Sequence, residues 1–353
     1  MPAKPIALAA NQPPRFYRGG AGIARFRGTP QPGPDRPEDF IASTTEVFGG
    51  GGGGLTTLDD GRRLRDLVEQ DPESFLGPDH VARYGSDLGL LTKMLDTGER
   101  LLVHFHPDAE FAARHLNCQH GKNEAWIILE TADVPGDDSA GHVFFGFAAD
   151  VEAPVVADWV SAQDTVTILQ AMNKIAVKPG DVFFVPAGIP HAIGTGITLV
   201  ELQEPTDFSI LLEWQGYRID GPTEGHLNLG FEVALQALDR RGWSADQISG
   251  IRAENPAESG HQSAAEPVVE LLPAPARSFF RAQAVTVSGN PVTFPPEFAV
   301  LIVVTGEGTL DTAAGSLELR RGATVLVPFA AGPSQLIGEL TLLRCLPPES
   351  SAS

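Results

Sequence analysis

The sequence contains little cysteine, few basic residues and no long apolar segment. Cys118 and Cys345 are the only cysteines among 353 residues, which excludes a disulfide framework and any cysteine-based zinc module. No apolar run approaches the roughly 18 residues of a membrane span, and the apolar stretch at residues 6–10 is too short for the core of a signal peptide. We therefore expect a cytoplasmic protein with no membrane partner, in which any metal is held by histidine and carboxylate ligands.

The charge balance narrows the possible partners further. Asp and Glu number 45 against 25 Lys and Arg, which gives a formal net charge of −20 at pH 7. No basic stripe interleaved with aromatic residues is present along the chain. Because such a chain repels the phosphates of nucleic acids and of anionic lipids, we expect neither as a partner.

Proline and glycine are abundant, and their placement indicates the fold class. The 29 Pro and 38 Gly separate short runs rich in Val, Ile, Phe and Leu, a texture typical of a mainly β sandwich or barrel with a few helices. Strands are predicted at residues 101–106, 125–130, 142–147, 165–169, 176–177, 181–185 and 197–203. Helical spacing predicts helices within 62–77, 108–116 and 226–242, whereas 16–28 suggest an edge strand or rim loop and glycines 49–54 a flexible loop.

A polar segment divides the chain in its last third. The sequence RAENPAESGHQSAAEP, at residues 252–267, has no apolar periodicity and is interpreted as a linker or long surface loop. We predict a catalytic domain at residues 1–250, a linker at 251–266 and a second β domain at 267–353. All nine histidines lie at or before His261, so the second domain is expected to carry no metal.

Two histidine-containing patterns could build a metal site. His104 and His106 alternate with Phe105 on a predicted strand, so both imidazoles project from the same face, as two ligands of one metal must. Glu124 begins a later predicted strand. Further along, GDVFFVPAGIPHAIG has the spacing G-x5-P-x-G-x2-H-x3-G, in which a Pro/Gly turn leads into a strand that begins with an inward-facing His191.

These patterns resemble, in the expected order, the two conserved motifs of the cupin superfamily. The resemblance implies one site with four ligands: His104, His106, Glu124 and His191. Within that superfamily, HFHPDAEFA, GKNEAW, VKPGDVFFVPAGIPHAIG and VELQEPTDF are similar to the blocks QVHPDDEYA, GKTECW, GD…PAGTVHAI and EIQQNSD of the type I phosphomannose isomerases. That similarity implies a bicupin of two jelly-roll barrels and a zinc-dependent aldose–ketose isomerase that acts on a sugar or sugar phosphate.

The chain departs from this family at two positions. His104 stands where the family has Gln, which creates a three-His, one-Glu ligand set that other cupins use for manganese, iron or nickel as well as zinc. Leu211 stands where the family has an active-site Arg. We therefore expect weak turnover of mannose 6-phosphate unless another arginine, such as Arg218, reaches the site.

The implied reaction requires proton carriers. Moving a proton between C1 and C2 of a sugar through a cis-enediol needs an electrophile at the sugar oxygens and a base over the carbons. Lys122, two residues before Glu124, matches the family's active-site lysine, and Glu204 and Asp207 are the other candidates. Two alternatives remain open at this point: an iron or manganese oxygenase, and a sugar-binding protein without catalytic activity.

Overall fold

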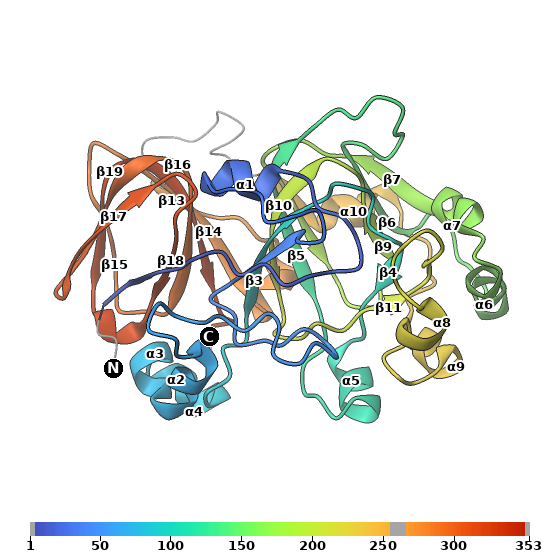
Figure 1. Cartoon of the computed structure of the whole chain (residues 1–353), viewed down its shortest axis with the longest axis horizontal. Coiled ribbons are helices and arrows are strands. Elements are labelled where there is room, and N and C mark those ends of the chain that lie inside the picture. The colour runs from blue at the N-terminus through green and yellow to red at the C-terminus, as the bar shows by residue number, and fades with distance from the viewer. Residues whose placement is uncertain (1–3, 255–265, 350–353) are drawn as a thin grey trace.

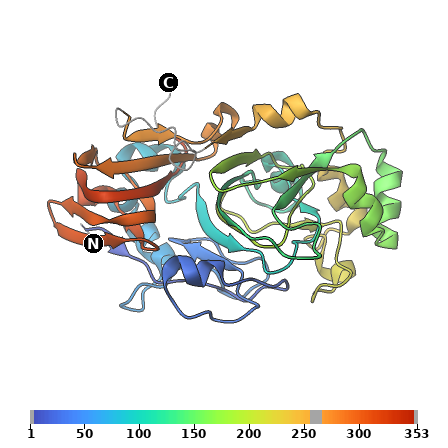
Figure 2. The same ribbon diagram turned by 90° about the horizontal axis from the view of Figure 1, so that it is seen from above.

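A computed structural model describes residues 4–254 and 266–349, and these residues form a mainly β protein (Figure 1). Two strand-rich bodies lie side by side, one from the middle of the chain and one from its C-terminal region (Figure 1). Seen from above in Figure 2, α10 (Ala245–Gly250) and the 3-10 helix η2 (Ala274–Ser278) follow one side of both bodies. This arrangement is compatible with the expected pair of barrels.

The middle body consists of two antiparallel sheets. The first has the order β12 (Arg252–Glu254), β8 (Asp181–Val185), β5 (Glu124–Thr131), β10 (Ile197–Gln203), β3 (Leu91–Asp96) and β2 (Glu38–Ile41). The second has the order β11 (Ile210–Leu211), β4 (His104–Phe105), β9 (His191–Ile193), β6 (His142–Phe147) and β7 (Met172–Ala176). The sheets face each other, because the Trp126 ring of β5 lies 5.4 Å from the His191 ring of β9.

The C-terminal body is one large antiparallel sheet that curls around its own apolar interior. Its strands are β13 (Val268–Glu270), β14 (Arg281–Ser288), β15 (Val292–Phe294), β16 (Ala299–Thr312), β17 (Gly315–Arg320), β18 (Thr324–Val327) and β19 (Ser334–Leu346). Strand β1 (Ile6–Ala7), from the other end of the chain, completes the edge by pairing with β18. The N-terminal segment therefore connects the two bodies.

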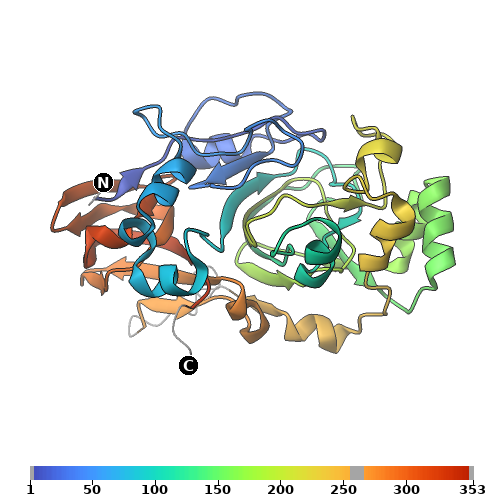
Figure 3. The same cartoon turned by 90° about the horizontal axis from the view of Figure 1, so that it is seen from below.

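Short helices cover the rims and one end of the molecule. They are α1 (Gly22–Arg27), α2 (Leu64–Gln70), α3 (Pro72–Leu76), α4 (Pro78–Tyr84), α5 (Ala109–His115), α6 (Ala153–Ala162), α7 (Thr165–Ala171), α8 (Gly221–Glu224), α9 (Phe231–Ala234), η1 (Leu235–Ala237) and η3 (Phe329–Ala331). Figure 3 shows α2–α4 beside the C-terminal body and α8 and α9 at the opposite end. Among the described residues, no helix is both long and apolar enough to cross a membrane.

The two bodies share a hydrophobic core. Buried aromatic side chains of the middle body, such as Trp126 and Phe183, belong to the same cluster as Phe280 and Phe298 of the C-terminal body. The sheet of the C-terminal body also encloses a second cluster, and a third lies between the five-stranded sheet and helices α6 and α7. Burial of this continuous apolar surface stabilises the packing of the bodies against each other.

One predicted strand is a helix. Residues 165–169 form part of α7, because the Asp164 side chain accepts a hydrogen bond from the Thr167 backbone N–H and so caps a helix. Ile168 is the buried residue of that helix. The β-branched residues of this segment favoured a strand, but the local cap and packing against α6 determine the structure.

Other expected elements are shorter than predicted or of a different kind. The helix expected at 226–242 shrinks to α9 and η1, because Leu227 and Asn228 both have positive φ angles (52° and 63°), which no α-helix accommodates. The edge strand suggested at 16–28 contains α1 instead. The strand expected at 101–106 is reduced to β4, and the helix within 62–77 divides into α2 and α3 at Asp71.

The expected linker is ordered at its start. Residues 252–254, which begin the predicted linker segment, form β12 and pair with β8. Residues 255–265 of that prediction lie outside the described residues.

Candidate active site

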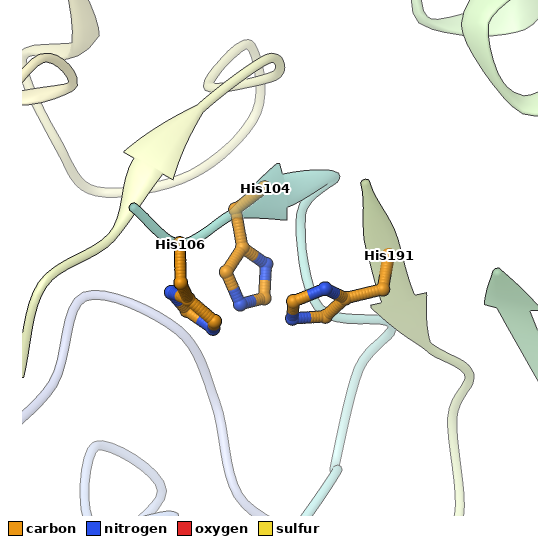
Figure 4. Close-up of side chains that lie close together, drawn as sticks. All are labelled: His104, His106 and His191. Carbon is orange, nitrogen blue, oxygen red and sulfur yellow. The ribbon is translucent and has the colours of Figure 1, made fainter. Parts of the chain in front are cut away.

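Three of the four predicted metal ligands converge between the two sheets of the middle body. His104 opens β4, His106 follows that strand, and His191 begins β9 directly opposite His104 in the ladder. Ring nitrogens of the three imidazoles lie within 4.8 Å of one another. Figure 4 shows the three rings pointing toward a common centre.

Backbone carbonyls fix the orientation of all three rings. The Nδ1 atoms of His104, His106 and His191 lie 2.9, 2.6 and 2.8 Å from carbonyl oxygens of Leu102, Phe208 and Ile189, respectively. Because a carbonyl can only accept a hydrogen bond, each Nδ1 carries the proton and each Nε2 keeps its lone pair. This is the state in which an imidazole binds a metal.

Burial keeps these imidazoles neutral. The pKa of each ring is lowered, chiefly because burial disfavours the charged form, and that of His191 falls to about 3. The Nε2 atom of His191 is buried without a hydrogen-bond partner in the described residues. A buried acceptor of this kind is costly unless a cation satisfies it, so the three side chains fit a metal ion.

Glu124, the fourth predicted ligand, lies beside the three histidines. One of its oxygens is 3.0 Å from Nε2 of His106, and the other is 3.6 Å from Nε2 of His191. The Nε1–H of Trp126 donates to the second oxygen. A carboxylate oxygen and an imidazole lone pair that face each other repel. A positive charge between them removes this repulsion, so the arrangement again fits a cation.

Lys122 supplies one positive charge at this place. Its Nζ lies 2.8 Å from Oε1 of Glu124 and 3.2 Å from Nε2 of His106. Burial raises the pKa of Glu124, but the positive charge of Lys122 outweighs that effect, and the net pKa is well below the ordinary value. The structure therefore brings Lys122 and all four predicted ligands into one buried group.

Asp207 lies between two buried cations. Its carboxylate is 3.3 Å from Nζ of Lys93 and 3.0 Å from NH1 of Arg15, and it also accepts the backbone N–H of Phe48. Burial raises the pKa of Asp207, but the two cations outweigh that effect and hold it below the ordinary value. Asp207 is therefore an ionised partner of Lys93 and Arg15.

Glu204 lies elsewhere. Its Oε2 accepts hydrogen bonds from both the backbone and the side-chain N–H groups of Asn123, and its Oε1 is 3.7 Å from His120, which also contacts Asp87. The residues lining the inner cavity do not include Glu204. This carboxylate holds the segment that carries Lys122 in place.

Sequence reasoning missed three charged residues of the pocket: Arg15, Glu38 and Glu201. Glu38 contacts both Arg15 and Lys93, and Glu201 is the cross-strand neighbour of Lys93. Burial and then Glu124 raise the pKa of Glu201 to about 8. An acidic residue inside the apolar run ITLVELQ was the available signal for Glu201, because a charge in a fully buried strand needs a partner.

Two cavities lie beside these charged residues and share part of their lining. The inner cavity, of about 40 Å³, is lined by His104, His191, Glu124 and Lys122, and by Lys93 and Glu201. The outer cavity, of about 520 Å³, has the size of a small-molecule site. Four residues line both cavities, and we call them the junction: Arg15, Phe16, Ser209 and Leu211.

The chain is similar to several known proteins. Residues 272–347 match the family model described as "Mannose-6-phosphate isomerase, cupin domain". The chain is 25% identical over 265 residues to mannose-6-phosphate isomerase ManA of Bacillus subtilis, covering 72% of this chain and 73% of that protein. It is 26% identical over 255 residues to the mannose-6-phosphate isomerase of Streptococcus mutans, with 72% of each chain covered. The chain is similar in sequence to these mannose-6-phosphate isomerases.

The same fold is found over nearly the whole length of a phosphomannose isomerase structure. The crystal structure of the mannose 6-phosphate isomerase from Bacillus subtilis superposes with a TM-score of 0.73 and 21% identity, covering 97% of this chain and 99% of that one. The family match within residues 272–347 assigns a cupin domain to the C-terminal body. The expected cupin fold is therefore confirmed.

Proposed function

We propose that this protein is a metal-dependent aldose–ketose isomerase of the mannose-6-phosphate isomerase type. One observation carries the proposal. Three neutral imidazoles, each with its Nδ1–H on a backbone carbonyl, converge beside the Glu124–Lys122 pair at a cavity that shares four lining residues with a second cavity of ligand size. The sequence relatives carry the name of that activity.

His104, His106, Glu124 and His191 would hold the metal, which we propose to be zinc. Manganese, iron and nickel also suit three imidazoles and one carboxylate. When bound, the ion supplies a Lewis acid for the sugar oxygens. The chain then needs to move a proton between C1 and C2 of the sugar.

Lys122 is the favoured proton carrier among the three that the sequence suggested. Its ammonium group is held within the inner cavity by Glu124 and His106, so it reaches any sugar carbon bound next to the ligands. Asp207 is engaged by two cations, and Glu204 is engaged by Asn123. We propose an electrostatic role for Asp207 and a positioning role for Glu204.

Solvent-exchange measurements with the purified native protein test this function. Elemental analysis should find about one divalent ion per chain, and incubation with candidate aldoses in D₂O should place deuterium at C2 of the sugar. The aldose panel includes mannose and mannose 6-phosphate. Oxygen consumption linked to turnover would identify an oxygenase instead, and sugar binding without exchange would identify a binding protein.

A further inference from the structure

The residue at position 211 is apolar, so one side of the junction between the two cavities has no cation. Leu211 pairs with His104 across β11 and β4, is only 2% exposed and lines both cavities. Its backbone N–H is bound by the carbonyl of Gly225, so the strand is fixed there. An apolar side chain at this point cannot recognise a negatively charged oxygen of a ligand.

A cation reaches the same junction from the opposite direction. Arg15 belongs to the N-terminal segment between β1 and α1, and its backbone N–H is held by the carbonyl of Asp35. Its side chain is only 11% exposed, and, like Leu211, it lines both cavities. No arginine other than Arg15 lines the inner cavity among the described residues, whereas Arg218, the sequence-based candidate, lines only the outer one.

The guanidinium of Arg15 is rigidly placed, but it retains free donors. NH1 and NH2 bond the two oxygens of Asp207 at 3.0 and 3.4 Å, and Nε lies 3.1 Å from Glu38. Each terminal nitrogen of an arginine has two N–H groups, and Asp207 occupies one on each. No further hydrogen bond of these two nitrogens is present within the described parts of the chain, so one N–H on each is available to a ligand.

We propose that Arg15 contacts a negatively charged oxygen of the substrate at the junction and determines substrate preference there. This inference rests on the proposed isomerase function. A sugar in the outer cavity must extend its reacting carbons past Arg15 to reach the inner cavity, because Arg15, Phe16, Ser209 and Leu211 separate the two. The charge comes either from a phosphate group or from the enediolate that forms during isomerisation, and a planar arginine suits both.

Steady-state kinetics of substituted proteins distinguish these sources. Arg15→Met should lower kcat/KM by about a hundredfold, the usual loss when one positioned electrostatic contact is removed. If a phosphate is bound, KM for mannose 6-phosphate rises and the constants for mannose stay unchanged. If the enediolate is bound, kcat falls for both sugars. Arg18→Met is the matched control, because Arg18 is exposed and lines neither cavity.

Two further variants separate substrate contact from a structural role. Arg15→Lys keeps a charge beside Asp207, and it should stay folded and lose less than the methionine variant. Adding Leu211→Arg to Arg15→Met returns a cation to the junction from β11, and it should recover at least about tenfold of the lost kcat/KM. If Arg15 only stabilises the fold, no such recovery is expected, because an arginine at position 211 does not replace Arg15 as the partner of Glu38.

One kinetic result would overturn the proposal. Native-like kcat and KM for both sugars in folded Arg15→Met, measured by C2 deuterium exchange, would show that Arg15 does not contact the substrate. Failure of the isomerase function itself looks different, because the native protein would then exchange no aldose at all.

Discussion

His104 and His191 face each other across the paired strands β4 and β9, with their ring centroids 4.3 Å apart. Each ring is oriented by the backbone carbonyl two residues before it, in Leu102 and Ile189. The ring orientation is therefore set within each short segment, whereas the meeting of the two rings depends on strand pairing. Removing either ring should leave the strands paired and abolish the metal site.

His104→Ala and His191→Ala should each weaken metal binding by at least about a hundredfold, because second-shell changes alone cost up to that much. Elemental analysis after dialysis checks the occupancy, and circular dichroism checks the fold. His115→Ala is the control, since His115 lies on α5 outside the group of three. Full occupancy in both site variants would contradict the proposed ligand set.

Lys122→Met should keep the metal and lose catalysis. The substitution removes the ammonium next to Glu124 and His106, and we expect C2 deuterium exchange to slow by about a hundredfold or more. Elemental analysis of the same sample separates loss of proton transfer from loss of metal. Lys174→Met, at an exposed position of β7, should exchange at the native rate. Native-rate exchange in the Lys122 variant would exclude Lys122 as the proton carrier.

Asp207→Asn should lower the free energy of unfolding by about 3 kcal/mol, because it removes one of the two carboxylates that the buried Arg15 and Lys93 share and leaves them only Glu38 to share. The pKa of Asp207 is depressed in the folded state, so its contribution to stability is fully present above the ordinary value of 3.8 and is lost gradually as pH falls from there through the lower folded-state pKa. Denaturant titrations at pH 7 and near pH 3 should therefore show a somewhat smaller difference from native near pH 3, because the folded carboxylate is still ionised there. Asp60→Asn, at an exposed pair with Arg62, should change stability by less than about 0.5 kcal/mol. Equal effects of the two substitutions at pH 7 would contradict this account.

His120→Gln should destabilise the protein in a pH-dependent way. The hydrogen bond to Asp87 and the nearby carboxylate of Glu204 raise the pKa of His120 to about 10 from 6.5, against the opposing effect of burial. A raised folded-state pKa stabilises fully below pH 6.5, and the effect disappears as pH rises toward 10. Because the side chain is 30% exposed, solvent screening limits the difference to about 1 kcal/mol at pH 6.

Thermal unfolding at pH 6 and pH 10 measures this difference. The gap between native and His120→Gln melting temperatures should be clear at pH 6 and close to zero at pH 10. His226→Gln is the matched control, since that ring bonds the backbone carbonyl of Pro222 and forms no ion pair in the described residues. A gap of constant size across this pH range would show that the His120 charge does not contribute.

Errors in the secondary-structure prediction have local physical causes. Residues 165–169 carry β-branched side chains, but the cap from Asp164 and the packing of Ile168 favour α7. Apolar periodicity predicted a helix across 226–242, but it contains no information about the positive φ of Leu227 and Asn228. The periodicity of apolar residues indicates which side chains are buried. A short segment, however, can bury the same side chains in more than one backbone conformation.

The sequence by itself was sufficient to predict the mainly β fold and the three histidines that gather at the site. His104 and His106 share a face because side chains alternate along a strand, and the turn before His191 contains its own proline and glycine. These are relations between near neighbours in the chain. The family motifs added Glu124 and Lys122, which the structure places beside the three histidines.

Only the tertiary structure decided the roles of the remaining charges. Arg15 lies in an irregular segment, and its partnership with Asp207, 192 residues away, depends on the folding of that segment beside β2, whose Glu38 also contacts Arg15. Glu204 and Asp207 are three residues apart, yet one positions Asn123 while the other pairs with buried cations. Whether a carboxylate becomes a proton carrier or an anchor depends on which distant groups surround it after folding, because the cost of burying a charge is offset only by partners in space.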